Sequence, residues 1–157
     1  MLKYVNYGVV FQEIPGETTL SINISNCPFR CPGCHSDYLR EDIGEELDIW
    51  SLSLLLDKYE DEITCVCFMG GDRDPKTIDM LAFMVKNMYT KLKVGWYSGA
   101  ERISFGVYRR NFDYIKIGPY IEEFGGLKSK TTNQRLYKID EYGQCVDITS
   151  KFWNETT

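Results

Sequence analysis

Residues Thr18–Cys34 read TTLSINISNCPFRCPGC, so a strand-like stretch runs directly into a loop with three cysteines. Within it, Thr18–Ser25 has the β-branched alternation that is typical of a strand. The loop cysteines Cys27, Cys31 and Cys34 have the spacing C-x3-C-x2-C, and no fourth cysteine lies close by in the sequence. The sequence therefore predicts three thiols grouped at the end of one strand.

Thiolates are the usual protein ligands of iron–sulfur clusters, and a [4Fe–4S] cube normally takes four of them. A compact loop that supplies three would leave one iron without a protein ligand. A metal centre needs such an open coordination position to bind something exchangeable. The spacing therefore indicates a cluster that does chemistry rather than one that only carries electrons.

Two other uses of these cysteines stay open. Disulfides need an oxidising compartment, and residues 1–20 contain no apolar core that resembles a signal peptide. A structural zinc site is the stronger alternative, because His35 follows Cys34 and Cys3His is a known zinc ligand set. Adjacent residues rarely turn toward the same metal, however, so an iron–sulfur cluster is the favoured interpretation.

The composition is that of an ordinary soluble globular protein. The 157 residues are 43% hydrophobic and 26% charged, which predicts a single domain over residues 1–157 with a sizeable core. A net charge of −5 gives no indication of the positive overall charge that is typical of nucleic-acid-binding proteins. No apolar run is long enough to span a bilayer. Six cysteines without an export signal favour the reducing cytoplasm.

Strand and helix signals alternate along the chain. We expect further strands at Ile63–Phe68, Lys91–Tyr97, Asp113–Ile117, Leu136–Ile139 and Cys145–Ile148. We expect helices at Asp48–Tyr59, after Asp74 with the apolar stripe Ile78, Leu81, Ala82, Val85 and Met88, and near Ala100–Tyr108. Alternation of this kind implies an α/β fold with a mainly parallel sheet. The chain is too short for an eight-unit barrel, so an open, partial βα barrel or a flatter α/β sheet is expected.

A second motif follows the expected strand Ile63–Phe68. Met69, Gly70, Gly71 and Asp72 come directly after it, at the edge of the sheet where ligands of such folds bind. Paired glycines alone would indicate only a tight turn. At this edge they also let backbone carbonyls approach a ligand, and Asp72 offers an anionic acceptor for a positively charged amino group.

The order and spacing of the two motifs resemble the radical S-adenosylmethionine (radical SAM) family. The chain is most similar to the activating proteins of the anaerobic (class III) ribonucleoside-triphosphate reductase. The matching features are the short length, Pro15-Gly16, Pro32-Gly33, Gly70-Gly71-Asp72, Tyr114–Gly118 and the run Thr131–Gln134. One departure is His35-Ser36, where some members have Tyr-Asn after the third cysteine.

The resemblance implies a partial βα barrel of the radical SAM type and a set of site residues. Cys27, Cys31 and Cys34 would hold a [4Fe–4S] cluster, and S-adenosylmethionine (SAM) would chelate the remaining iron. Gly70, Gly71 and Asp72 would grip the methionine amino group. Ser98, at the end of the strand Lys91–Tyr97, would lie near the cofactor, although it could equally cap a following helix. The motifs assign no further catalytic residue.

The function that the resemblance implies is that of a glycyl-radical activating enzyme. Its protein substrate would be the anaerobic ribonucleoside-triphosphate reductase, and its electron donor a low-potential protein such as flavodoxin or ferredoxin. The expected docking rim comprises Tyr114, Lys116, Gly118, Asn133 and Gln134. The alternatives are activation of another glycyl-radical enzyme of the pyruvate formate-lyase type, radical chemistry on a small metabolite, and a non-enzymatic zinc-binding interaction module.

Overall fold

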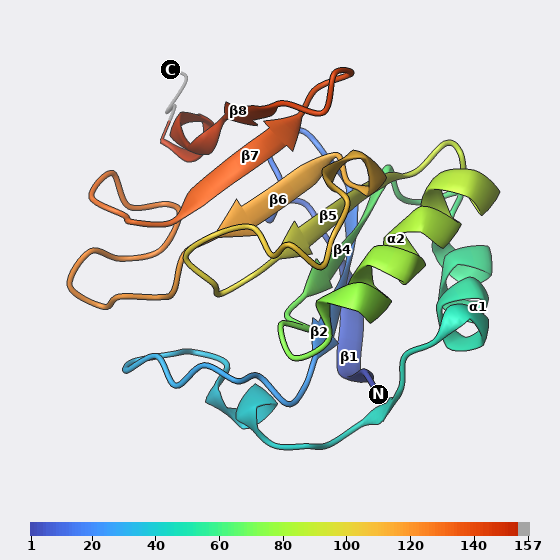
Figure 1. Cartoon of the computed structure of the whole chain (residues 1–157), viewed down its shortest axis with the longest axis horizontal. Coiled ribbons are helices and arrows are strands. Elements are labelled where there is room, and N and C mark those ends of the chain that lie inside the picture. Colours follow the sequence, from blue (N-terminus) through green and yellow to red (C-terminus); the bar gives the residue numbers. More distant parts are fainter. Residues whose placement is uncertain (154–157) are drawn as a thin grey trace.

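The computed structural model describes residues 1–153 and builds them around one eight-stranded sheet (Figure 1). The strands are β1 (Lys3–Val10), β2 (Thr19–Ile24), β3 (Glu45–Glu46), β4 (Cys65–Met69), β5 (Lys93–Tyr97), β6 (Tyr114–Ile117), β7 (Arg135–Ile139) and β8 (Cys145–Asp147). The α-helices are α1 (Ile49–Tyr59) and α2 (Pro75–Met88), and short 3₁₀ helices cover Asp37–Arg40, Arg109–Asn111 and Thr149–Phe152.

The sheet is mixed. Its strand order is β3-β1-β2-β4-β5-β6-β7-β8. The four central strands β2, β4, β5 and β6 pair in parallel, whereas β1, β3, β7 and β8 extend the two edges by antiparallel pairing. The parallel pairing of the central strands agrees with the alternation of strand and helix signals in the sequence. The antiparallel pairing of the edge strands was not expected from that alternation.

The expectation of a partial βα barrel of the radical SAM type with a mainly parallel sheet is therefore wrong. A βα barrel follows each strand with a helix, but the described part of the chain has two α-helices for eight strands. The helix expected near Ala100–Tyr108 does not form. There the Ser104 hydroxyl accepts a hydrogen bond from the Gly106 N–H at 3.0 Å, a local turn that competes with helix formation.

Both helices pack on the same face of the sheet, where they lie side by side (Figure 1). Helix α1 starts with a capping box formed by Asp48 and Ser51, and in α2 the N-cap side chain of Asp74 accepts from the Thr77 N–H at 3.2 Å. Of the expected α2 stripe, four members are fully buried, but Met88 at the end of the helix is exposed. No helix in residues 1–153 combines the length and apolar composition that crossing a bilayer requires.

The opposite face of the sheet is covered by a strap, residues 11–18, and by the segment after β8. Ile14 of the strap is fully buried among Cys65 and Cys67 of β4 and Leu136 of β7. The two β4 cysteines are thus small core residues on one face, as their spacing of two predicts. Because both faces of the sheet are covered, the loops at the carboxyl ends of the parallel strands remain as the place for a site.

Candidate functional site

The three-cysteine loop extends from the carboxyl end of β2, beyond the edge of the sheet (Figure 1). Its start is fixed by the Cys27 N–H, which donates to the carbonyl of Leu39 at 2.9 Å. A turn brings the Cys34 N–H to the Cys31 carbonyl at 3.2 Å. Gly33 has φ +77° in this turn, a conformation that residues with a side chain rarely adopt, so a glycine is favoured here.

The thiols of Cys27, Cys31 and Cys34 are free and half-buried. All three line one small cavity of about 100 Å³, together with Met69 and Gly70 from the end of β4 and with Arg40. We call this the cysteine cavity. Burial raises the pKa of the Cys27 thiol, and the nearby Asp72, Cys31 and Cys34 raise it further. The structure therefore brings together the three cysteines and the glycine motif, as the sequence predicted.

The glycine motif forms a tight bend at the end of β4. Gly70 and Gly71 have φ of +108° and +89°, and a Cβ on Gly71 would lie 2.6 Å from the Ile78 side chain. The Gly70 carbonyl accepts a hydrogen bond from the Trp96 indole at 2.7 Å, and its N–H donates to the Tyr97 carbonyl at 3.0 Å. The bend is thus held by β5 and admits no side chain.

Asp72 is directed toward the end of β5. Its carboxylate accepts hydrogen bonds from the Ser98 hydroxyl and, at 3.2 Å, from the Gly99 N–H. Burial raises the pKa of Asp72, although these two hydrogen bonds and the charge of Lys116 act in the opposite direction. Ser98 is almost fully buried, and its hydroxyl also accepts from the Ala100 N–H at 3.1 Å. Ser98 therefore holds the Asp72 carboxylate in place through the hydrogen bond that its hydroxyl donates.

Lys116 was expected on an exposed docking rim, but it lies inside the site, with 8% of its surface exposed. Its ammonium group donates to the carbonyls of Ser98 at 3.2 Å and Gly118 at 2.9 Å and lies 5.9 Å from the centre of the Tyr97 ring. Burial lowers the pKa of Lys116 to about 8, against the nearby charges of Asp72 and the three cysteines. A lysine in the otherwise apolar strand Tyr114–Ile117 was the signal that could have identified it.

The other residues of the expected rim are not an exposed surface either. Tyr114 and Gln134 are buried, and the Tyr114 hydroxyl donates to Glu17 at 2.5 Å at the far end of the strand. Gly118 is buried, and its carbonyl accepts from the Gln134 amide at 3.4 Å. Asn133 is half-buried and donates to the Pro119 carbonyl at 3.0 Å. These contacts shape the connection between β6 and β7.

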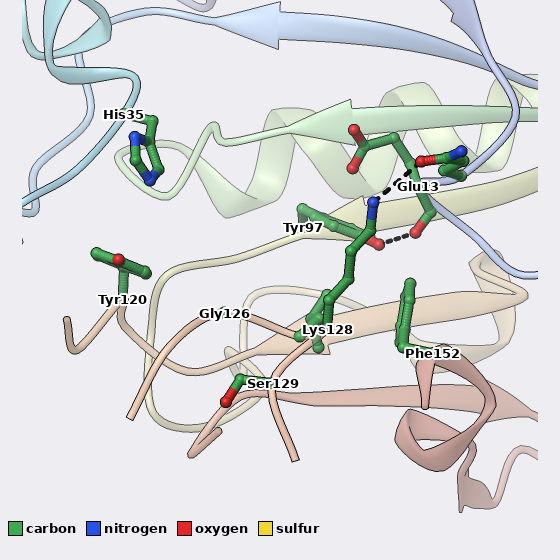
Figure 2. A pocket seen from close by; sticks show the side chains of 10 residues that line it. Glu13, His35, Tyr97, Tyr120, Gly126, Lys128, Ser129 and Phe152 are labelled. Atoms are coloured by element: carbon green, nitrogen blue, oxygen red, sulfur yellow. Dashed lines mark hydrogen bonds between the residues drawn. The ribbon is translucent and has the colours of Figure 1, made fainter. Parts of the chain in front are cut away.

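A larger groove of about 700 Å³ opens beside the cysteine loop (Figure 2). We call it the Tyr97 groove; its lining includes Glu13, His35, Tyr97, Tyr120, Lys128 and Phe152. Figure 2 shows the rings of His35 and Tyr120 at one end, with centres 5.8 Å apart. The strap forms one wall, where the Tyr97 hydroxyl donates to the Glu13 carbonyl and Lys128 donates to Gln12 at 3.0 Å.

Two arginines that the sequence did not single out hold the cysteine loop. Arg40 donates from Nη2 to the Cys31 carbonyl at 2.9 Å, and Arg73 donates from Nε to the Asn26 carbonyl at 2.9 Å. Arg40 lines the cysteine cavity, whereas Arg73 is exposed. Arg40 ends a short 3₁₀ helix and Arg73 lies in a turn, so no periodic pattern could have revealed them.

The three thiols around the cysteine cavity are the metal donors that this site offers. Among residues 1–153, no three His, Cys, Asp or Glu side chains converge closely enough to hold one metal ion. The thiolates of a [4Fe–4S] cube bind separate irons, so they surround a cavity. Three free thiols around the cysteine cavity fit this arrangement and leave one iron for another ligand.

Comparisons of this chain with protein-family models, with curated proteins and with solved structures each find no match. No family is therefore assigned to the chain. The function must be argued from the chemistry of the site.

Proposed function

We propose that the protein is a glycyl-radical activating enzyme that cleaves SAM reductively and generates a glycyl radical on the anaerobic ribonucleoside-triphosphate reductase. The observation that carries the proposal is the meeting of three free thiols, a half-buried carboxylate and a buried ammonium group at one end of the sheet. The proposal concerns the chemistry of this site and does not require a βα barrel.

The cysteine cavity would hold the [4Fe–4S] cluster through Cys27, Cys31 and Cys34. When bound, the reduced cluster supplies the electron that breaks the sulfonium S–C5′ bond of SAM. The protein's own contribution is to fix the loop: Gly33 packs against Glu122, and the Phe29 ring occupies the space beside Gly99, where a Cβ would lie 2.8 Å from the ring. A fixed loop keeps the three thiols around one centre.

Asp72 and Lys116 are suited to the amino-acid part of SAM. The Asp72 carboxylate is an acceptor for an α-ammonium group. A lysine ammonium has three donors, and Lys116 uses two of them on the carbonyls of Ser98 and Gly118, which leaves one for a carboxylate. Opposite charges on the ligand would offset the burial of both side chains, so the pair favours a zwitterion over a singly charged molecule.

The Tyr97 groove is the proposed entry for the partner. It opens next to His35 of the cysteine loop and offers aromatic and polar side chains to a polypeptide segment. A glycine-bearing loop of the reductase that fills it would exclude water from the site. A low-potential donor such as flavodoxin or ferredoxin would supply the electron.

The test is anaerobic reconstitution of the protein with iron and sulfide, followed by addition of SAM, reductant and the reductase. We expect slow formation of 5′-deoxyadenosine by the protein alone. With the reductase present, we expect faster SAM cleavage and an electron paramagnetic resonance signal of a glycyl radical on the partner. A reductase whose radical-site glycine is replaced by alanine is the matched control and should give no signal.

Other outcomes would redirect the proposal. A glycyl radical that forms only on a pyruvate formate-lyase type partner would change the substrate. Rapid turnover of a small metabolite without any protein partner would move the enzyme to metabolite chemistry. Stoichiometric zinc without iron or sulfide after anaerobic purification would favour a non-enzymatic interaction module.

A further inference from the structure

Arg40 is the one arginine among the residues that line the cysteine cavity. The chain on either side of it is paired with the start of the cysteine loop: the Leu39 carbonyl accepts from the Cys27 N–H at 2.9 Å, and the Glu41 carbonyl accepts from the Asn26 N–H at 3.0 Å. These two hydrogen bonds fix the backbone position of Arg40. The side chain of Leu39, next to Arg40, is buried and also holds the segment in position.

The guanidinium group of Arg40 has one buried donor that the described chain does not satisfy. Its Nη2 donates to the Cys31 carbonyl at 2.9 Å, whereas its Nε is buried without a hydrogen-bond partner in residues 1–153. Buried donors in folded proteins nearly always have an acceptor. Because Arg40 lines the cavity around which the three thiols lie, its guanidinium group is placed beside any sulfur held there.

The charge of Arg40 has a second consequence. A guanidinium group stays protonated at all ordinary pH values. The reduction potential of an iron–sulfur cluster depends on net charge, on hydrogen bonds to its sulfurs and on solvent exposure. A fixed positive charge at the cavity wall stabilises the more negative, reduced form, so it raises the potential.

We propose that Arg40 is a positioning residue that donates a hydrogen bond to a sulfur of the bound cluster and sets its reduction potential. This inference rests on the proposed function, because it requires an iron–sulfur cluster in the cysteine cavity. Arg40 would make that cluster easier to reduce by a physiological donor and would hold Cys31 in its ligating position.

Arg73 provides a matched control. It makes a similar arginine-to-carbonyl bond beside the same loop, to Asn26 at 2.9 Å, but its side chain is exposed and does not line the cavity. If Arg40 acts only by holding the loop in position, replacement of Arg73 should have the same effect. If Arg40 acts on the cluster itself, replacement of Arg73 should leave the cluster unchanged.

The experiment is a potentiometric titration of the reconstituted cluster without SAM, followed by electron paramagnetic resonance, in the wild type, Arg40→Gln and Arg73→Gln. We expect Arg40→Gln to lower the ratio of reduced to oxidised cluster about tenfold at a fixed potential, a negative shift of about 59 mV for a one-electron couple. Arg73→Gln should titrate like the wild type. An Arg40→Gln cluster with the wild-type potential, or an equal shift in Arg73→Gln, would overturn the inference.

If Arg40→Gln does not fold, an Arg30→Lys protein labelled with ¹⁵N-arginine decides, because the nitrogens of Arg30 next to Cys31 would otherwise give a coupling of their own. Pulsed electron paramagnetic resonance of the reduced cluster should then show a weak ¹⁵N coupling, and its absence would contradict the hydrogen bond. A wild-type protein that takes up no iron or sulfide overturns the proposed function together with this inference. A loaded wild type with no Arg40 effect overturns the inference alone.

Discussion

At the scale of single residues, the site is defined by charges that the fold buries. Asp72 follows β4 and Lys116 lies in β6, with β5 between these two strands. Burial raises the pKa of Asp72 and lowers that of Lys116, so it favours the neutral form of each. Buried charges destabilise a protein unless they are paired or bind a ligand. Their presence at the same end of the sheet as three free thiols is therefore an argument for a zwitterionic ligand.

Replacing Asp72 with alanine should weaken SAM binding and leave the cluster in place, because Asp72 is the proposed acceptor for the amino group of SAM and is not an expected iron ligand. Loss of a charge-assisted hydrogen bond costs roughly 1.5–3 kcal/mol, or about 10- to 150-fold in affinity. Equilibrium dialysis of the reconstituted protein measures this. Asp37→Ala, an exposed carboxylate after the cysteine loop, is the control. Unchanged affinity in Asp72→Ala would remove Asp72 from the site.

Replacing Lys116 with methionine should change how the stability of the iron-free protein depends on pH. Burial lowers the pKa of Lys116 from 10.5 to about 8, so the unfolded chain binds its proton more tightly than the folded chain between these pH values. The wild type should therefore gain stability relative to Lys116→Met as the pH rises from about 8 to about 10.5. The gain should approach about 3 kcal/mol.

Urea unfolding of both proteins across this pH range checks the Lys116 prediction. The same variant should bind SAM poorly after reconstitution. A stability difference that is constant with pH, or that moves in favour of Lys116→Met, would show that Lys116 is not a buried charge.

At the scale of elements, the strap is joined to the sheet by a polar cluster around Glu17. Glu17 accepts hydrogen bonds from Thr64 at 2.7 Å, Lys93 at 2.8 Å and Tyr114 at 2.5 Å. Burial raises the pKa of Glu17, but these hydrogen bonds outweigh it and the net pKa is lowered. The cluster therefore ties the strap, which forms a wall of the Tyr97 groove, to the starts of three parallel strands.

Glu17→Gln should destabilise the protein by about 2 kcal/mol at neutral pH, because hydrogen bonds to a charged group are lost. The pKa of Glu17 is lower in the folded than in the unfolded chain, so its stabilisation is present above the unfolded value and is lost as the pH falls through the folded value. Thermal unfolding of both proteins from pH 7 down to pH 3 should show the difference shrinking below about pH 4.5. Asp42→Asn, which breaks an exposed pair with Lys3, should have little effect at any pH.

The elements that sequence patterns revealed are those with strong local signals. The cap at Asp74 and the stripe that begins at Ile78 predicted α2. Strand patterns, such as the β-branched alternation of Thr18–Ser25 and the apolar run Ile63–Phe68, predicted the four central strands. β1 was missed because its residues are half-buried on both faces and do not alternate clearly. β3 consists of two exposed glutamates and carries no pattern.

At the scale of the whole molecule, the prediction of a partial barrel was wrong because local periodicity predicts a strand but not the direction in which an edge strand runs. β7 was expected as a strand, but nothing in Leu136–Ile139 indicates that it runs antiparallel to β6. The position of the cysteine loop and the glycine motif at one end of the sheet was nevertheless predicted correctly, since parallel strands bring their carboxyl ends together. The roles of Lys116 and Arg40 needed the three-dimensional arrangement.

The central claim is that Cys27, Cys31 and Cys34 hold a [4Fe–4S] cluster, and iron and sulfide analysis after anaerobic reconstitution tests it most directly. The wild type should hold about four irons and four sulfides per chain, and replacement of any one of the three cysteines by alanine should abolish the intact, active cluster. Cys65→Ala and Cys145→Ser should retain wild-type iron, because Cys65 is buried in the core and Cys145 lies on β8. A Cys65→Ala protein that lost its iron while Cys31→Ala kept it would contradict the account.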